Sequence, residues 1–245
     1  MPSGRSRAVA PLKESVTGRA LLVALATAAA VAMPGAAQTP AYRSGWRSWT
    51  VAAGAGVFAV LPELLHLPRG APSCAPCDPA GLSGLDRWVV RLHSRGAGTG
   101  SNVVVAGVVG GGLLASRTHG NAAMMVNAVA FTQLTTEWTK VLVHRSRPIL
   151  YTAQAPSAAA DRDNRRSFPS AHTATAFAVA TSYAVMAHRQ QLPHATRNSI
   201  LLFSGAAGVG SMRVAAGRHF VTDVLGGAVL GAAVGWVTTK VFPTK

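Results

Sequence analysis

The sequence predicts an all-α protein, a membrane-associated bundle of about six helices with its functional site at the helix ends. Hydrophobic residues make up 49% of the 245 residues and charged residues only 13%, which is too apolar for a disordered chain and too poor in charge for an ordinary soluble surface. No stretch shows the alternation of a β-strand, whereas several apolar stretches have helical length. They lie at residues 49–67, 102–116, 121–143, 171–187, 198–216 and 221–242.

The N-terminus has the order of a signal peptide. Basic residues from Arg5 to Arg19 precede an apolar stretch from Ala20 to Met33, and small residues follow as far as Ala37. An uncleaved membrane anchor is the alternative interpretation of residues 1–37. Both interpretations place the next segment outside the cytoplasm.

Two further regions follow this start. Residues 38–100 are predicted to form an N-terminal helix and a linker that contains Cys74 and Cys77, and residues 101–245 are predicted to form the core. For the two cysteines, a small disulfide in an exported loop is favoured over a redox motif or half of a metal site, because no βαβ pattern surrounds them and no second pair exists.

The apolar stretches differ in their fitness to span a bilayer, which takes about 20 helical residues. The stretch 221–242 is long enough, whereas 102–116 is short. Gly227, Gly231 and Gly235 recur every four residues and share one helix face, a spacing that allows close approach of another helix.

The charge balance favours an anionic partner. Lys and Arg number 23 against 8 Asp and Glu, a formal net charge of +15, which suits anionic lipid or an anionic substrate. The chain carries no nucleic-acid-binding fold signature, so no nucleic-acid partner is expected. After Asp163 the only acidic residue is Asp223. This lone carboxylate either has a specific partner or is a chance acid at a helix N-terminus.

The first of three basic motifs runs from Lys140 to Arg147 and Pro148. Lys140 and Arg147 are seven residues apart, so on a helix they share one face, and Pro148 would then end the helix. Together they could clamp a dianion. The alternative is a basic cluster at a membrane edge.

The second motif is Ser167-Phe-Pro-Ser170-Ala171-His172-Thr. Proline and serine before an apolar run predict a helix start, with Ser170 as its cap. The backbone N–H groups of such a start bind anions, and His172 would lie in the first turn. The alternative is an ordinary cap with a solvated histidine.

The third motif holds Arg213, Gly217, His219 and Asp223. His219 and Asp223 are four residues apart, so on a helix the carboxylate can reach the imidazole, fix its tautomer and leave the other ring nitrogen free to attack. Gly217 would allow a turn between two helices. The alternative is a surface ion pair of little energetic value.

In this order the three motifs resemble the type-2 phosphatidic-acid phosphatase and vanadium haloperoxidase superfamily, over about residues 120–240. The chain departs from the family pattern at two positions. Ala171 stands where the family usually has glycine, and it keeps the backbone N–H. Met212 stands directly before Arg213, where the family usually has serine.

The resemblance implies a metal-independent phosphatase that works through a phosphohistidine intermediate. His219 attacks phosphorus, His172 transfers the proton and Asp223 orients His219. The implied phosphate-binding residues are Lys140, Arg147, Ser170, Ala171 and Arg213. We expect no metal and no cofactor, because the matched motifs hold one carboxylate.

The expected substrate is a phosphate monoester or diphosphate, with a phosphorylated lipid preferred to a small phosphate ester. The expected location is the bacterial cell envelope, in the inner membrane or periplasm with the site facing the periplasm. Three alternatives remain open: a soluble periplasmic non-specific acid phosphatase, a vanadium haloperoxidase, and a non-enzymatic membrane protein that binds anionic lipid. Four arginines outside the motif positions could add positive field near the site, and each is expected to be solvated rather than bound to substrate: Arg145, Arg165, Arg166 and Arg218.

Overall fold

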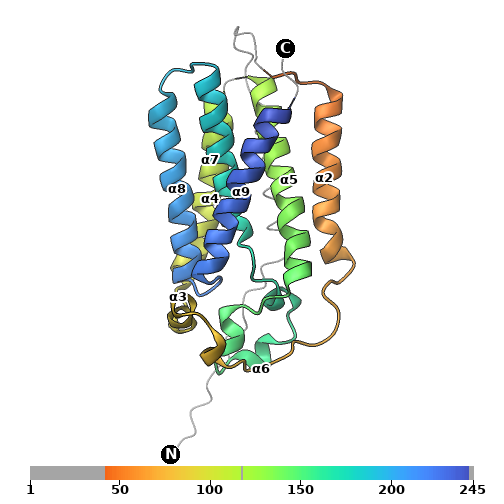
Figure 1. Ribbon diagram of the computed structural model, residues 1–245, viewed down its shortest axis with the longest axis vertical. Coiled ribbons are helices and arrows are strands. Elements are labelled where there is room, and N and C mark those ends of the chain that lie inside the picture. The colour runs from red at the N-terminus through yellow and green to blue at the C-terminus, as the bar shows by residue number, and fades with distance from the viewer. Residues whose placement is uncertain (1–41, 117, 243–245) are drawn as a thin grey trace, which may run out of the picture.

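The structure, a computed structural model, describes residues 42–116 and 118–242, and within them six long helices form a bundle (Figure 1). These helices are α2 (Trp46–Leu64), α4 (Arg95–Ser116), α5 (His119–Val143), α7 (Ala171–Arg189), α8 (Ala195–Ala215) and α9 (Val221–Val241). Each predicted apolar stretch is confirmed as one of them. The predicted signal peptide or anchor at residues 1–37 lies outside the described residues.

Two connecting segments cover one end of the bundle, the lower end in Figure 1, and we call them the cap (residues 65–94 and 144–170). Short helices make up much of the cap: η1 (Pro79–Gly81), α3 (Gly84–Arg87), η2 (Trp88–Arg91), η3 (Pro148–Tyr151), α6 (Ala155–Ala158) and η4 (Arg162–Arg165). The predicted disulfide between Cys74 and Cys77 is formed in the cap. The N–H of Cys77 donates to the carbonyl oxygen of Leu150 at 2.8 Å, which joins the two segments.

Helix α7 is the centre of the bundle and packs against α4, α5, α8 and α9, whereas α2 packs against α5. Its buried positions are mostly small, including Ala174, Ala176, Ala178 and Ala180. Small side chains let four neighbouring helices approach one central helix closely.

The predicted glycine face of α9 lies directly on the backbone of α7. A Cβ atom on Gly231 would lie 1.9 Å from the carbonyl oxygen of Ala174, and one on Gly235 would lie 2.5 Å from that of Ala178. These distances are far below van der Waals contact, so only glycine fits. The packing holds the first turns of α7 and α9 side by side.

Helix α4 begins at Arg95, seven residues before the predicted stretch, so the expected boundary between residues 100 and 101 falls inside it. Three glycines within residues 95–101 lower the helix propensity of this segment. Gly98 and Gly100 face α8, where added Cβ atoms would lie 3.8 Å from Ala216 and 3.5 Å from Met212. Tertiary packing therefore overrides the low helix propensity of glycine.

Two described helices, α4 and α9, are long and apolar enough to cross a bilayer. The expectation that the second apolar stretch is too short is therefore wrong, because the helix is 22 residues long. Large apolar side chains are also exposed on the outside of the bundle, and such surfaces mark contact with lipid or with another protein. They include Val51, Val57, Phe58, Ile200, Leu201, Leu225, Val229, Trp236 and Val241.

Candidate active site

The candidate residues of all three motifs lie at the cap end of the bundle. Helices α5 and α8 end there, and α7 and α9 begin there (Figure 1). Lys140 is in the last turn of α5 and Arg213 in the last turn of α8, while His172 and Asp223 are in the first turns of α7 and α9. The fold thus gathers motifs that are far apart in sequence.

His219 lies in the turn between α8 and α9 and is fully buried. Gly217 makes the turn possible, because its φ is +62° and a Cβ atom there would lie 1.9 Å from the carbonyl oxygen of Leu92. The Nδ1 atom of His219 lies 2.8 Å from the carbonyl oxygen of Ser167. A carbonyl can only accept a hydrogen bond, so Nδ1 carries the proton and Nε2 keeps its lone pair.

This arrangement corrects the expected role of Asp223 in fixing the tautomer. Its Oδ2 atom lies 3.7 Å from Nδ1 of His219, within ion-pair distance but beyond a hydrogen bond. His219 precedes α9, which begins at Val221, so the two residues are not one helical turn apart on the same helix. Ser167, a residue without an assigned role in the sequence interpretation, supplies the hydrogen bond instead.

The electrostatic surroundings keep the imidazole neutral. Burial is the main cause that lowers the pKa of His219 to about 3. Asp223 raises this pKa, whereas the positive charges of Arg147 and Arg213 lower it. The neutral ring at pH 7 is the form that can attack an electrophile.

Asp223 has specific partners, in agreement with one of the two interpretations of this lone carboxylate. Its Oδ2 atom accepts hydrogen bonds from the hydroxyl of Ser167 at 2.5 Å and from the N–H of Phe220 at 2.8 Å. Its Oδ1 atom accepts from Arg145 at 2.5 Å. The bond to Phe220 also caps the first turn of α9.

Arg147 does not share a helix face with Lys140, contrary to the sequence interpretation. Helix α5 ends at Val143, and His144 adopts the left-handed conformation of a helix C-cap. Arg147 is therefore in extended backbone, and Pro148 begins η3 instead of ending α5. His144 itself is exposed.

The three predicted phosphate-binding cations are all buried, and each contacts a polar side chain. These contacts join Lys140 Nζ to Glu137 at 2.8 Å, Arg147 Nη2 to Asp163 at 2.8 Å, and Arg213 Nη1 to Ser101 at 3.4 Å.

The second motif forms the start of α7, as predicted. Ser170 occupies the N-cap position, but its hydroxyl accepts from Thr173 at 3.0 Å and makes no cap bond. Its N–H donates to the carbonyl oxygen of Asp223 at 3.0 Å. Ala171 is the first helical residue, and Nε2 of His172 lies 2.8 Å from Oδ1 of Asn102.

Two arginines that were expected to be solvated are buried. Arg166 pairs with Glu63 at 2.7 Å and with Glu137. Arg165 donates to the carbonyl oxygens of Gly70 at 2.6 Å and Pro68 at 3.1 Å. The sequence holds one indication of a buried cation here. Glu63 and Glu137 lie in apolar stretches, and a buried carboxylate requires a cationic partner.

Arg145 was also expected to be solvated, yet its side chain is only 23% exposed and it bridges two buried carboxylates. These are Asp86 at 2.7 Å and Asp223 at 2.5 Å. Asp86 lies outside all three motifs, so no motif could have predicted this contact.

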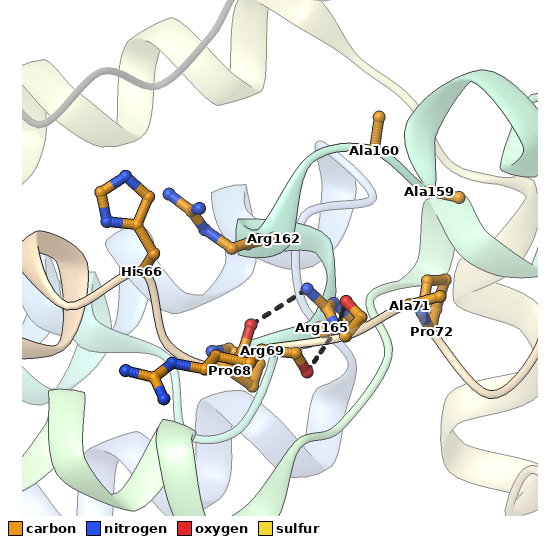
Figure 2. A pocket seen from close by; sticks show the side chains of 10 residues that line it. His66, Pro68, Arg69, Ala71, Pro72, Ala159, Ala160, Arg162 and Arg165 are labelled. Atoms are coloured by element: carbon orange, nitrogen blue, oxygen red, sulfur yellow. Dashed lines mark hydrogen bonds between the residues drawn. The ribbon is translucent and has the colours of Figure 1, made fainter.

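A separate cavity of about 570 Å³ lies in the cap between residues 66–72 and 159–165. Figure 2 shows His66, Arg69, Arg162 and Arg165 around it, with Arg165 bonded to the opposite wall. None of the motif residues lines this cavity. It is therefore distinct from the candidate active site.

The residues that the structure describes contain no group of three or more His, Cys, Asp or Glu side chains placed to hold a metal ion. The acids near the site are instead bound to cations, as Glu137 is to Lys140 and Asp163 is to Arg147.

The model of the PAP2 superfamily matches residues 121–245, which is just over half of the chain and includes all three motifs. The chain belongs to the PAP2 superfamily. The resemblance that the motifs indicated is therefore confirmed.

One known protein is similar to part of the chain, and one solved structure is similar to most of it. A lipid A 1-phosphatase of Porphyromonas gingivalis is 36% identical over 80 residues, which are 31% of this chain and 17% of that protein. The matched part is thus less than a fifth of that relative's length. The solved structure of a transmembrane PAP2 type phosphatidylglycerolphosphate phosphatase from Bacillus subtilis is 22% identical, with a TM-score of 0.39 over 93% of this chain and 86% of the other.

Proposed function

We propose that this protein is a metal-independent phosphatase that hydrolyses a lipid phosphate through a phosphohistidine intermediate on His219. The state of His219 carries the proposal: its imidazole is buried, its Nδ1 atom contacts the carbonyl oxygen of Ser167, and burial together with the charges of Arg147 and Arg213 lowers its pKa. A neutral ring nitrogen is a nucleophile, and guanidinium groups bind phosphate oxygens. Membership of the PAP2 superfamily supports the same chemistry.

The first chemical step transfers the phosphoryl group to the enzyme. The lone pair of Nε2 of His219 attacks phosphorus, and the bond between phosphorus and the leaving oxygen breaks. His172 donates a proton to that oxygen, so the product leaves as an alcohol, or as a phosphate when the substrate is a diphosphate. Asp223, at 3.7 Å, stabilises the positive charge that His219 gains.

The second step returns the enzyme to its starting state. His172, now neutral, takes a proton from a water molecule, whose oxygen attacks phosphorus. The bond between phosphorus and Nε2 breaks, inorganic phosphate forms, and His219 is neutral again. Acid and base roles thus alternate on one residue, as microscopic reversibility requires.

Positive groups compensate the charge of the transferring phosphoryl group throughout. Lys140, Arg147 and Arg213 are buried, so their charges act through a medium of low dielectric constant. The N–H of Ala171 and the hydroxyl of Ser170, at the start of α7, complete the set of donors. Such preorganised donors can supply the stabilisation that Mg²⁺ supplies in other phosphotransferases.

A lipid substrate fits the position of the site. The site lies at the end of a bundle with two helices that can cross a bilayer and with large exposed apolar side chains. A site at this level meets a phosphorylated headgroup whose acyl chains stay in the membrane. The two relatives, which are named as lipid phosphatases, support the same substrate class.

The proposal places the site on the periplasmic side. The disulfide of Cys74 and Cys77 lies in the cap, and disulfides persist in oxidising compartments. A single cysteine introduced by Ser157→Cys, in a Cys74→Ser/Cys77→Ser background, tests this placement, since Ser157 is exposed in the cap. Labelling by a membrane-impermeant maleimide in intact spheroplasts is expected. Labelling only after lysis would place the site in the cytoplasm.

The activity test is phosphate release by purified protein in detergent and EDTA. The substrates are phosphatidic acid, phosphatidylglycerol phosphate, an isoprenyl diphosphate and p-nitrophenyl phosphate. Wild type is compared with His219→Ala and with His188→Ala, a matched control because His188 is exposed at the other end of the bundle. Release that EDTA leaves intact and only His219→Ala abolishes is expected, with lipid substrates preferred. A preference for p-nitrophenyl phosphate would favour a soluble-substrate phosphatase.

A further inference from the structure

Arg145 connects the candidate active site to a carboxylate from a different part of the chain. Its Nη1 atom lies 2.5 Å from Oδ1 of Asp223, and its Nη2 atom lies 2.7 Å from Oδ2 of Asp86. Both carboxylates are fully buried. The guanidinium group also stacks over the ring of Phe220, with its carbon 4.6 Å from the ring centroid.

Thr222 closes this arrangement into a ring of hydrogen bonds. Its hydroxyl donates to Asp86 at 2.6 Å and accepts from Nη1 of Arg145 at 2.6 Å, which uses its donor and one lone pair. Its N–H donates to the other oxygen of Asp86 at 3.1 Å. Asp86 therefore holds the guanidinium group and the first turn of α9, which carries Asp223, in one geometry.

Asp86 is charged in this setting. Burial alone would raise the pKa of Asp86, but hydrogen bonds from Thr222 and Arg145 outweigh burial and lower it. One guanidinium group thus lies between two carboxylates. Its Nη1 and Nη2 atoms each contact a carboxylate oxygen.

The cap segment that carries Asp86 packs against the residues around His219. Leu82 and Val89, on either side of Asp86, pack with Phe220 in one buried cluster. The carbonyl oxygen of Leu92, at the end of the same segment, contacts the backbone of Gly217 so closely that no Cβ atom fits. This part of the cap therefore fixes both the turn that holds His219 and the position of Asp86.

We propose that Asp86 and Arg145 are positioning residues that hold Asp223 in the place from which it stabilises the charge on His219. The proposal rests on the proposed function for its catalytic consequence. It assigns a role to residues 82–92, which lie outside the part of the chain that the PAP2 superfamily model matches. Without Arg145, Asp223 would be a buried carboxylate that has lost its guanidinium partner. Such a carboxylate rotates toward another partner or takes up a proton.

The test compares Asp86→Asn with Asp78→Asn. Asp78 is a matched control because it lies in the same cap segment, is exposed, and contacts the N–H of Ala80. We expect Asp86→Asn to lower kcat about 10- to 100-fold with KM unchanged, as loss of an orienting neighbour does at other sites. Asp78→Asn should leave both constants within about twofold. An effect on KM alone, or equal effects of the two variants, would overturn the proposal.

A double-mutant cycle shows whether Asp86 acts through Asp223. In an Asp223→Asn background, Asp86→Asn should cause no further loss, because the residue that it positions is already neutral. A full additional 10- to 100-fold loss would mean that Asp86 acts elsewhere. Arg145→Lys, which keeps the charge but cannot bridge two carboxylates, should fall between wild type and Arg145→Gln.

An NMR measurement that needs no turnover tests the positioning role independently of the proposed phosphatase activity. In protein labelled with ¹⁵N-histidine, Asp86→Asn should shift the Nδ1 resonance of His219, whereas Asp78→Asn should not. This result would support the positioning role even if wild type released no phosphate from any substrate. An unmoved His219 resonance in Asp86→Asn would overturn it, whatever the activity.

Discussion

The Nδ1 atom of His219 lies 2.8 Å from the carbonyl oxygen of Ser167. Ser167 also donates its hydroxyl to Asp223 at 2.5 Å, so a single residue contacts both members of the pair. Its backbone fixes the tautomer of the imidazole, and its side chain holds the carboxylate that stabilises the imidazolium in the proposed mechanism. The two contacts of Ser167 explain how His219 can be oriented although it lies outside the helix that carries Asp223.

The protonation of His219 is the first prediction. We expect the ring to remain neutral from pH 7 down to about pH 4, because its pKa is lowered to about 3. The ¹⁵N chemical shifts of labelled histidine, with His219→Gln to assign the signal, measure this directly. An inflection of this signal near pH 6.5, the ordinary value, would contradict the buried environment.

The same shift predicts how stability depends on pH. Between the unfolded pKa of 6.5 and the folded pKa of about 3, the unfolded chain binds one more proton at His219 than the folded protein does. The contribution of His219 to stability is therefore lost as pH falls through this window. Thermal unfolding in detergent should depend less on pH in His219→Gln than in wild type.

Arg213 is expected to act on the transition state. Arg213→Ala should lower kcat by about 10²- to 10³-fold, the loss typical of removing one donor from a charged transition state. Steady-state kinetics on the best lipid substrate measures this. Arg197→Ala is the control, because Arg197 is exposed at the other end of α8. Comparable losses in the two variants would remove Arg213 from the site.

Asn102 is expected to orient His172. Its Oδ1 atom lies 2.8 Å from Nε2 of His172, and loss of this contact would let the ring leave its productive position. We expect Asn102→Ala to lower kcat about 10- to 100-fold while KM stays unchanged. Asn198→Ala, at the far end of the bundle, should leave kcat unchanged. An unchanged kcat in Asn102→Ala would exclude the orienting role.

The glycine contact between α7 and α9 is expected to be essential for stability. Gly231→Ala places a Cβ atom 1.9 Å from a backbone oxygen of α7, and overpacking of this kind costs about 1–3 kcal/mol. Thermal unfolding in detergent should show a lower midpoint. Gly208→Ala on α8 is the matched control, because no heavy atom lies within 4 Å of its added Cβ. Equal midpoints would show that the helices separate without cost.

The sequence was sufficient to predict the helices and the motif residues at their ends. Long apolar stretches bounded by proline and polar residues gave all six helices, because burial of apolar surface dominates their formation. The start of α4 was missed, since Gly98 and Gly100 lower helix propensity locally and their packing against α8 is a tertiary effect.

The supporting contacts of the site could not be predicted. Asp86 and Arg145 are 59 residues apart in sequence, and Ser167 acts on His219 through a backbone carbonyl that any residue possesses. Arg166 is buried only because the fold brings Glu63 and Glu137 to it. Acids within apolar stretches indicate that a cationic partner is needed, but side-chain type and spacing do not indicate which residue supplies it.

The covalent intermediate is the most direct test of the mechanism. Wild type and His219→Gln are mixed with a ³²P-labelled lipid phosphate, quenched within milliseconds in alkaline detergent, in which phosphohistidine survives, and digested for mass spectrometry. We expect one labelled peptide, modified at His219, that forms and decays at rates compatible with turnover and is absent from His219→Gln. Phosphate release by wild type without label on His219, or with label on another residue, would contradict the proposed mechanism.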